Sequence, residues 1–381
     1  DLYGFCGGCQ LQHITYEGQL SLKTQKVKDV IERIGHQNPD LVKPALGPKE
    51  PWAYRNKMQM PVGGTKGDIQ IGFYAMGSHD IVQGTNCPIQ DEGNNIIAQA
   101  CYQIAKEFDI EPYDEHTGKG VLRHIIGRIG QSGWMIILVT ATEQLPYKEK
   151  WVEKLTERIP QVETIVHNVN SKRTNVILGP KNNILYGDGT ITDHIKDLQF
   201  TLSPHSFFQV NPEQTTVLYD QALEYADLKG DETVIDAYCG TGTISLFLAH
   251  KAKHVIGIEI VEPAIINARE NAKRNGYDNT EFIVADAAVE MPKLYKAGVR
   301  PDIIVFDPIR AGCKEEVLTS AAGMEPKRIV YVSCNPATMA RDIEILTHYG
   351  YELQEVQPVD MFPMTAHVEA VALLTRSKAT Q

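Results

Sequence analysis

The sequence predicts an α/β protein whose C-terminal part is a doubly wound parallel sheet, and two observations support this prediction. From residue 232 onward, short apolar stretches alternate with stretches of helical spacing. Each expected strand ends on a polar residue or a glycine turn, which is typical of a ligand site along the carboxyl edge of a parallel sheet. The expected strands span residues 233–237, 254–259, 281–284, 302–306 and 330–332, and the expected helices span 244–249, 263–275 and 338–348.

The chain before this sheet predicts a helix followed by a mixed α+β region without a catalytic constellation of its own. Helical spacing runs through residues 16–34 and ends at Gly35, and a strand-like region covers 57–82. The other expected elements are helices at 94–108, 147–158 and 214–225 and strands at 121–130, 134–140, 164–169 and 175–178. We therefore expect an N-terminal segment (1–90), a central α+β domain (91–200) and a C-terminal domain (201–381).

Size and composition predict a multidomain protein of the cytoplasm. The chain has 381 residues, and its seven cysteines are an odd number, which favours a reducing compartment over a disulfide framework. No apolar run approaches the roughly 20 residues of a membrane helix, no signal peptide opens the chain, and Asp1 suggests that residues precede it. The net charge of −11 argues mildly against nucleic acid, although basic residues outnumber acidic ones between Lys23 and Lys66.

Cys334 is the strongest candidate for a nucleophile. It follows the apolar residues 330–332, and Asn335 and Pro336 stop the expected strand directly after it. A thiol at the carboxyl edge of a sheet, ahead of a helix, can be activated as a thiolate by the helix N-terminus or by nearby cations. For a cysteine taken alone, the alternative of a small buried hydrophobic residue is the commoner one.

The cysteines near the N-terminus predict a second kind of site. In Cys6-Gly7-Gly8-Cys9 the two glycines let both sulfur atoms face one centre, and Cys87 could supply a third ligand from a distance. A metal or iron–sulfur site, a redox pair and a thiol pair without metal are all compatible with this spacing.

Carboxylates at the ends of the expected strands indicate which nucleotide the sheet binds. The first turn reads DAYCGTGTIS, in which Asp236 lies beside Gly240 and Gly242 and no lysine of a phosphate loop is present. Glu259 is placed to bind a ribose diol, and Asp286 to bind an adenine amino group. This set suits the cation S-adenosylmethionine better than NAD, with helix capping as the alternative role of each carboxylate.

Residues 203–211, SPHSFFQVN, combine aromatic and polar side chains ahead of an expected helix. Phe207 and Phe208, with Gln209 and Asn211 close to them, would form a platform that stacks on a flat ring and hydrogen-bonds its edge. Burial of both phenylalanines in the core is the alternative.

Together these motifs resemble the RNA uracil-5 methyltransferase family, and within it the 23S rRNA branch. The motifs that carry the resemblance are CGGCQLQH at 6–13, NCPIQ at 86–90, SPHSFFQVN at 203–211, DAYCGTGTISL at 236–246, FDPIRAGC at 306–313, YVSCNPATMARD at 331–342 and HVEAVALL at 367–374. The resemblance implies a Rossmann-like S-adenosylmethionine-dependent domain, a central RNA-binding domain, and methylation of uridine C5 in 23S rRNA.

The resemblance also implies roles for individual residues. Cys334 would add to C6 of uracil, and Glu369 would then remove the C5 proton, its pKa raised by an apolar strand. Asp307 would bind the uracil edge, Arg310 would orient the substrate near the thiol, and Gln209 would lie close to cofactor and base. Ile309 departs from the DPPR sequence that is usual at this place in the family.

At the N-terminus, the resemblance implies that Cys6, Cys9 and Cys87 hold a 4Fe–4S cluster. The first cysteine of that pattern would be expected six residues before Cys6, which falls just ahead of Asp1. A TRAM-like β-barrel domain is expected upstream of it.

Three other functions compete with 23S rRNA methylation by a monomeric enzyme. The tRNA branch of the family methylates the T-loop, and CGGCQLQH argues against it. A non-catalytic RNA chaperone would not need Cys334 and Glu369 together. A methyltransferase acting on an exocyclic amine would carry an aromatic residue where Arg310 stands. The sequence leaves open which uridine is methylated, and whether one or two sites are served.

Overall fold

The computed structural model describes residues 2–377 and divides into two compact units. The first unit consists of residues 1–13 and 50–212, and the second unit of residues 14–49 and 213–381. Each unit has its own sheet and its own core.

The sheet of the second unit has the strand order β12-β11-β10-β13-β14-β16-β15. Strands β10 to β14 are parallel, whereas β16 pairs antiparallel with both β14 and β15. The chain adds strands toward one edge of the sheet from β10 to β12 and toward the other edge from β13 onward. The order of strands therefore reverses between β10 and β13, the place where α/β sheets bind ligands. The bounds are β10 (Thr233–Asp236), β11 (His254–Glu259), β12 (Thr280–Val284), β13 (Ile303–Phe306), β14 (Arg328–Ser333), β15 (Tyr351–Val359) and β16 (Glu369–Arg376). The predicted doubly wound sheet is confirmed.

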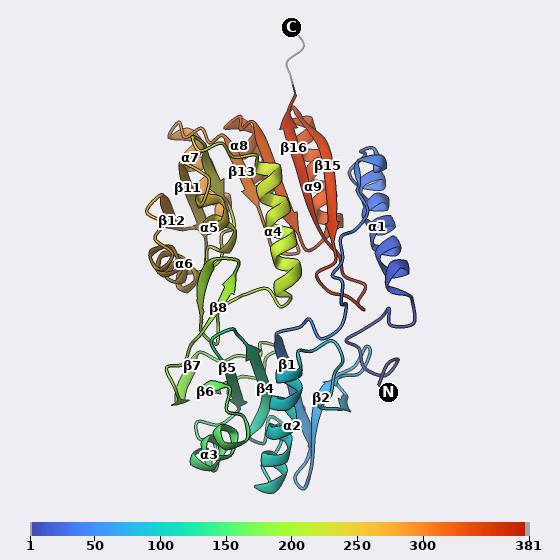
Figure 1. Ribbon diagram of the computed structural model, residues 1–381, viewed down its shortest axis with the longest axis vertical. Helices are drawn as coiled ribbons and strands as arrows, with labels where there is room; N and C mark the ends of the chain where they lie inside the picture. The colour runs from blue at the N-terminus through green and yellow to red at the C-terminus, as the bar shows by residue number, and fades with distance from the viewer. Residues whose placement is uncertain (1, 378–381) are drawn as a thin grey trace. The chain divides into compact units, whose positions relative to one another are not determined.

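Helices cover both faces of this sheet, as Figure 1 shows. One face shares a core with α1 (Tyr16–Arg33), α7 (Ala287–Lys296), α8 (Glu315–Gly323) and α9 (Pro336–His348). The other face carries α4 (Pro212–Ala226), α5 (Thr243–Ala249) and α6 (Glu262–Arg274). The short helix η1 (Pro39–Leu41) follows α1.

Helix α1 belongs to the second unit although the first unit follows it in the chain. Its apolar stripe, including Val27 and Ile31, is fully buried in the core shared with α9. Lys23 lies on the same buried side and pairs with Asp360 at an Nζ–Oδ1 distance of 2.6 Å. Lys23, the first of the basic residues noted between Lys23 and Lys66, is therefore buried inside the unit.

The sheet of the first unit has the order β3-β2-β1-β4-β5-β6-β7. Helices α2 (Glu92–Glu107) and α3 (Lys148–Arg158) pack on one face of it in a single apolar core. The strand bounds are β1 (Lys57–Thr65), β2 (Asp68–Tyr74), β3 (Ile81–Gln83), β4 (Leu122–Ile129), β5 (Trp134–Thr140), β6 (Val162–Val169) and β7 (Lys181–Tyr186), with a separate hairpin of β8 (Ile191–Ile195) and β9 (Leu198–Leu202). This sheet combines strands from both sides of residue 90, at which the sequence suggested a domain boundary. The two compact units therefore divide the chain at other places, near residues 13, 49 and 212.

The strand expected at 175–178 is wrong, because side chains bind the backbone carbonyl groups that a ladder would need. Arg123 donates to the carbonyl oxygen of Thr174, and the Asn170 amide donates to those of Val176 and Ile177. The edge strand is β7 instead, which begins at Lys181. His167 and Asn168 in β6 are hydrogen-bonded inside the unit, in keeping with ordinary strand-end polar residues.

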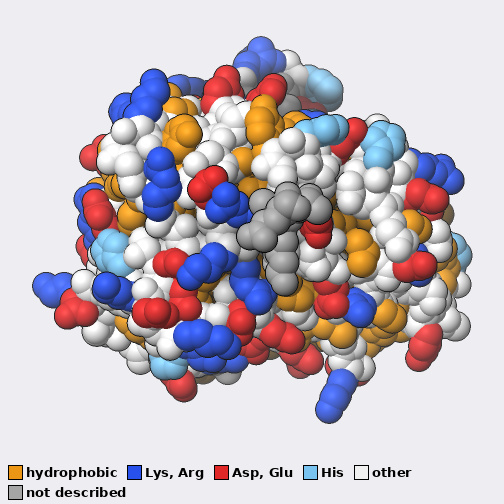
Figure 2. Space-filling model, turned by 90° about the horizontal axis from the view of Figure 1, so that it is seen from above, with side chains coloured by type: hydrophobic (Ala, Val, Ile, Leu, Met, Phe, Trp, Pro, Cys, Tyr) orange, Lys and Arg blue, Asp and Glu red, His pale blue; other side chains and the backbone are white. Residues whose placement is uncertain are grey.

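Within residues 2–377, no helix is long and apolar enough to span a membrane. Basic and acidic side chains are interspersed on the face that Figure 2 shows.

Candidate active site

Cys334 directly follows β14 and precedes α9 in the second unit. Asn335 caps this helix, since its side-chain oxygen accepts a hydrogen bond from the N–H of Ala337, and Pro336 occupies the first turn. The Asn335 amide and the Thr338 hydroxyl also donate to the carbonyl oxygen of Arg310, at 3.0 and 3.1 Å. The loop after β13 is thereby fixed against the turn that carries the thiol.

The buried carboxylate of Asp342 on α9 fixes the loop at 307–313 by hydrogen bonds. Its Oδ2 atom accepts from the Tyr331 hydroxyl at 2.5 Å and from the Cys313 N–H at 2.8 Å, and Arg341 Nε binds Oδ1 at 2.8 Å. Gly312 has a φ of +79°, and an added Cβ would come within 2.7 Å of Asp342. Glycine is therefore required where the loop passes over this carboxylate.

The charges around Cys334 belong to the residues that the sequence predicted to act with it on the substrate. Burial raises the pKa of the half-buried Cys334 thiol, the carboxyl groups of Glu369 and Asp307 raise it further, and Arg310 lowers it. The structure thus brings together all four residues to which the sequence assigned substrate chemistry in this unit. Arg310 is the cation that favours a thiolate.

Glu369 is the first residue of β16 and only 5% exposed. Burial, followed by repulsion from Asp307, raises its pKa to about 8, against the opposing effect of Arg310. The direction is the one expected for a carboxyl group in an apolar strand. Such a group can both hold and release a proton near neutral pH.

Asp307 at the end of β13 and Asp236 at the end of β10 continue this row of carboxyl groups. Burial, with Asp236 as the second cause, raises the pKa of Asp307 to about 7. Burial raises the pKa of Asp236 to about 6, while the Ser245 hydroxyl donates to its Oδ2 atom at 2.6 Å. Oδ1 of Asp236 is buried without a partner among the described residues, so this site offers an acceptor to a cationic or hydrogen-bond-donating ligand.

The glycine turn after β10 has the left-handed geometry that its sequence requires. Gly240 and Gly242 have φ angles of +53° and +83°. The Gly240 N–H donates to Glu259, whose other carboxylate oxygen accepts from the N–H of Val261. Asp286 caps α7 and pairs with Lys314 at 3.0 Å, so the capping alternative holds for this residue.

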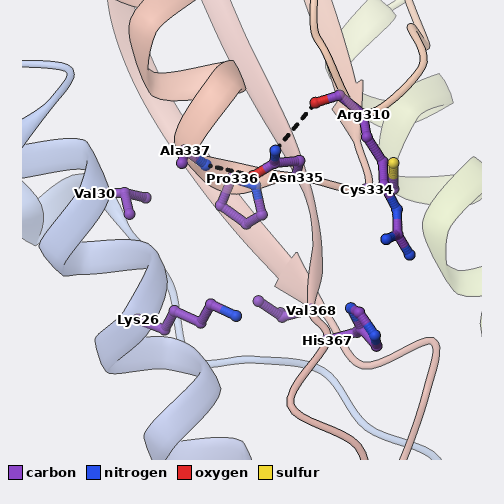
Figure 3. A pocket seen from close by; sticks show the side chains of 9 residues that line it. All are labelled: Lys26, Val30, Arg310, Cys334, Asn335, Pro336, Ala337, His367 and Val368. Carbon is purple, nitrogen blue, oxygen red and sulfur yellow. Dashed lines mark hydrogen bonds between the residues drawn. The ribbon is translucent and has the colours of Figure 1, made fainter. Parts of the chain in front are cut away.

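A cavity of about 230 Å³ opens beside Cys334, as Figure 3 shows. Lys26 and Val30 reach it from α1, and Arg310 and His367 line it from the other side. Lys26 donates to the carbonyl oxygen of Ala366 at 2.9 Å. The sequence did not single out Lys26 or His367, because only the docking of α1 brings Lys26 close to the thiol.

The predicted platform lies in the first unit, and its two phenylalanines differ. Phe207 is 73% exposed, whereas Phe208 is buried against Phe200 with a ring-centroid distance of 5.5 Å. Gln209 is half-buried. Of the two aromatic rings, Phe207 is therefore the one that a ligand can reach.

The three candidate ligands of an iron–sulfur cluster also lie in the first unit. Burial raises the pKa of the Cys9 thiol to about 11, and Cys87 and Cys6 raise it further, so the three sulfur atoms affect one another. In the part of the chain that the structure describes, however, no group of three or more His, Cys, Asp or Glu side chains is arranged to hold a metal ion.

The strand order of the second unit, with the antiparallel β16 beside β14, is that of Rossmann-like methyltransferases. The family model described as tRNA (Uracil-5-)-methyltransferase matches residues 137–377. This chain belongs to that family.

Relatives and a solved structure agree with this family. Proteins described as uncharacterized RNA methyltransferases are 53% identical over 377 residues in Bacillus cereus and 50% identical over 381 residues in Clostridium acetobutylicum, each match covering 98% of this chain and 82% of the relative. The Pyrococcus abyssi tRNA (uracil-54, C5)-methyltransferase in complex with S-adenosyl-L-homocysteine is similar with a TM-score of 0.80 and 28% identity, over 98% of this chain and 86% of that one.

Proposed function

We propose that the protein methylates C5 of a uridine in RNA, with S-adenosylmethionine as methyl donor and Cys334 as nucleophile. The observation that carries the proposal is the grouping of Cys334 with Glu369, whose pKa of about 8 suits proton removal. Family membership supports the reaction class.

The cofactor would lie along the carboxyl edge from β10 to β12, held by Asp236, Glu259 and the turn at Gly240 and Gly242. The unpartnered Oδ1 atom of Asp236 supports this assignment, because a cationic ligand would satisfy it. When bound, S-adenosylmethionine supplies a methyl group as an electrophile. Asp286, at the N-terminus of α7, completes the proposed contacts on this edge.

The protein's part in the reaction begins with Cys334. Its thiolate adds to C6 of uracil, the C5–C6 π bond breaks, and the electrons move toward C5 and O4 as an enolate. Asp307, protonated through its raised pKa, can donate a hydrogen bond to the developing oxyanion. Once C5 carries the methyl group, Glu369 removes the C5 proton, the π bond forms again, and the sulfur atom leaves.

Replacement of Cys334 by Ala tests this proposal. The variant should lose turnover while it retains S-adenosylmethionine binding, because the proposed cofactor contacts do not include the thiol. Wild-type protein, but not the variant, should form a covalent complex with RNA that contains 5-fluorouridine. Methylation by the variant at the wild-type rate would overturn the mechanism.

We propose 23S rRNA as the substrate, served by a monomeric cytoplasmic enzyme. The resemblance of CGGCQLQH to the rRNA branch supports this, whereas the similarity to the Pyrococcus abyssi tRNA enzyme favours the tRNA T-loop as the second candidate. Mass spectrometry of both RNAs after incubation with labelled S-adenosylmethionine decides between them. The iron–sulfur cluster stays a prediction, and no step above depends on it.

A further inference from the structure

Two basic residues face each other directly in the sheet of the first unit. In the antiparallel pair of β1 and β4, Lys57 is the cross-strand partner of Arg128. Directly opposed residues project from the same face of a sheet, and like charges in that position destabilise it. The pair therefore needs an explanation beyond strand pairing.

Arg128 is almost entirely buried, with 3% of its surface exposed. Its Nη2 atom donates to the carbonyl oxygen of Ser206, but Nε and Nη1 have no partner among the described residues. Asp193 is the carboxylate whose charge acts on Arg128, yet no ion pair joins them. The N–H groups at Nε and Nη1 of a buried guanidinium are thus left without an acceptor, which is costly.

Lys57 is in a similar state. Its side chain is half-buried, and its ammonium group has no hydrogen-bond or ion-pair partner within residues 2–377. Burial and the positive charges of Arg128 and Arg55 lower its pKa to about 7. Arg55 Nε donates to the carbonyl oxygen of Lys57, which places a third cation beside the pair.

His205 completes this group, which we call the basic cluster: Arg55, Lys57, Arg128 and His205. The His205 side chain reaches solvent. Partial burial of its ring is the first cause that lowers its pKa, and the positive charges of Arg128 and Lys57 lower it further. It lies one residue before Ser206, the acceptor for Arg128. The cluster is therefore open to solvent at His205.

The position of the cluster on the sheet separates it from the core. Met58, the neighbour of Lys57 in β1, and Ile125, three residues before Arg128 in β4, belong to the apolar core shared with α2 and α3. Lys57 alternates with Met58 along β1, so it points to the opposite face of the sheet. The cations are therefore not a by-product of packing against these helices.

We propose that the basic cluster binds one phosphodiester group of the RNA substrate, a role that rests on the proposed function. Arg128 keeps N–H donors at Nε and Nη1, each of which can make a charge-assisted hydrogen bond to a phosphate oxygen. Lys57 and Arg55 supply charge from the side, and His205 lies at the open end. The bound anion would turn a repulsive pair into a bridged one.

Replacement of Lys57 by Met distinguishes this role from a structural one. Binding of a labelled single-stranded RNA that contains uridine should weaken about 10- to 100-fold, the effect of losing one charge-assisted contact. The slope of log affinity against log salt should become shallower by about 0.7, as for one lost phosphate contact on a single strand. The free variant should nevertheless have a higher melting temperature, because the unpaired like charge is gone.

Lys66, in the turn after β1, provides the matched control. It is exposed and lies 3.8 Å from Asp109, so Lys66→Met removes the same charge without touching the cluster. This control should leave RNA affinity and salt slope unchanged. Lys57→Arg should retain most of the affinity, since it retains the charge.

The two proposals fail in different ways. Unchanged RNA affinity and salt slope in Lys57→Met would overturn the phosphate site, while methylation by the wild-type protein would still support the proposed function. Absence of methylation by the wild-type protein, with Lys57-dependent RNA binding intact, would overturn the function and leave the site standing.

Discussion

At the scale of single residues, the site depends on carboxyl groups that stay protonated at unusually high pH. Burial and repulsion from Asp307 raise the pKa of Glu369 to about 8, and burial and repulsion from Asp236 raise the pKa of Asp307 to about 7. A neutral Glu369 repels the neighbouring thiolate less than a charged one. The same group must then lose its proton before it can act as a base.

Replacement of Glu369 by Gln should trap the covalent adduct. The amide cannot accept the C5 proton, whereas Cys334 and the cofactor contacts remain. Methylated RNA should therefore stay bound to the protein in a denaturing gel. Release of free methylated RNA by the variant at the wild-type rate would remove Glu369 from the role of base.

The rate of product release should rise with pH and level off above about pH 8. A carboxyl group with a raised pKa is mostly protonated at pH 6 to 7 and becomes the active carboxylate as pH passes about 8. Single-turnover release of methylated RNA, measured between about pH 6 and about pH 9, checks this. A rate that falls over this interval would contradict the assignment.

At the scale of elements, two buried carboxylates fix helices that the site requires. Asp342 joins α9 to the loop at 307–313, and Asp360 joins the end of β15 to α1. Both act through groups on a different element, so both are positioning residues.

Asp342→Asn should slow the formation of the adduct with 5-fluorouridine RNA by about tenfold or more, because small displacements of reacting groups are costly. The amide cannot accept from Tyr331, Cys313 and Arg341 together. Cofactor affinity should change much less than the rate. Glu344→Gln is the control and should react normally, because Glu344 is a half-buried residue of α9 that lies 3.6 Å from His36 and does not contact the loop at 307–313. Equal rates in both variants would exclude the positioning role.

Lys23→Ala should destabilise the second unit by about 3 to 5 kcal/mol, the usual effect of leaving one member of a buried ion pair uncompensated. Asp360 would be that unpaired charge, although the Tyr16 hydroxyl still donates to it. Urea denaturation measures the loss. Lys28→Ala, on the same helix and without an ion pair among the described residues, should change stability little, and an equal loss in both variants would contradict the role of the pair.

At the scale of the whole molecule, the sequence predicted local features well and long-range ones poorly. Strand β5 and strand β11 have the predicted bounds, since apolar runs and turn residues are local signals. The antiparallel insertion of β16 between β14 and β15 could not be predicted, because pairing between distant segments leaves no periodicity. The candidate site residues within the quoted motifs could be named in advance because each motif is a local signal. Lys26 and the opposition of Lys57 and Arg128 could not, because they depend on contacts between distant segments.

The discontinuity of the second unit has a consequence for biosynthesis. Helix α1 leaves the ribosome early, but its buried lysine finds its partner only when residue 360 has been made. The whole first unit, which is continuous from residue 50 to 212 apart from a short N-terminal segment, is synthesised in between. Because domains fold as units during translation, the first unit can be complete while α1 still waits as an unpaired amphipathic segment. The second unit is thus begun before most of the first unit and completed after all of it, and a nascent chain has no complete active site until β16 emerges.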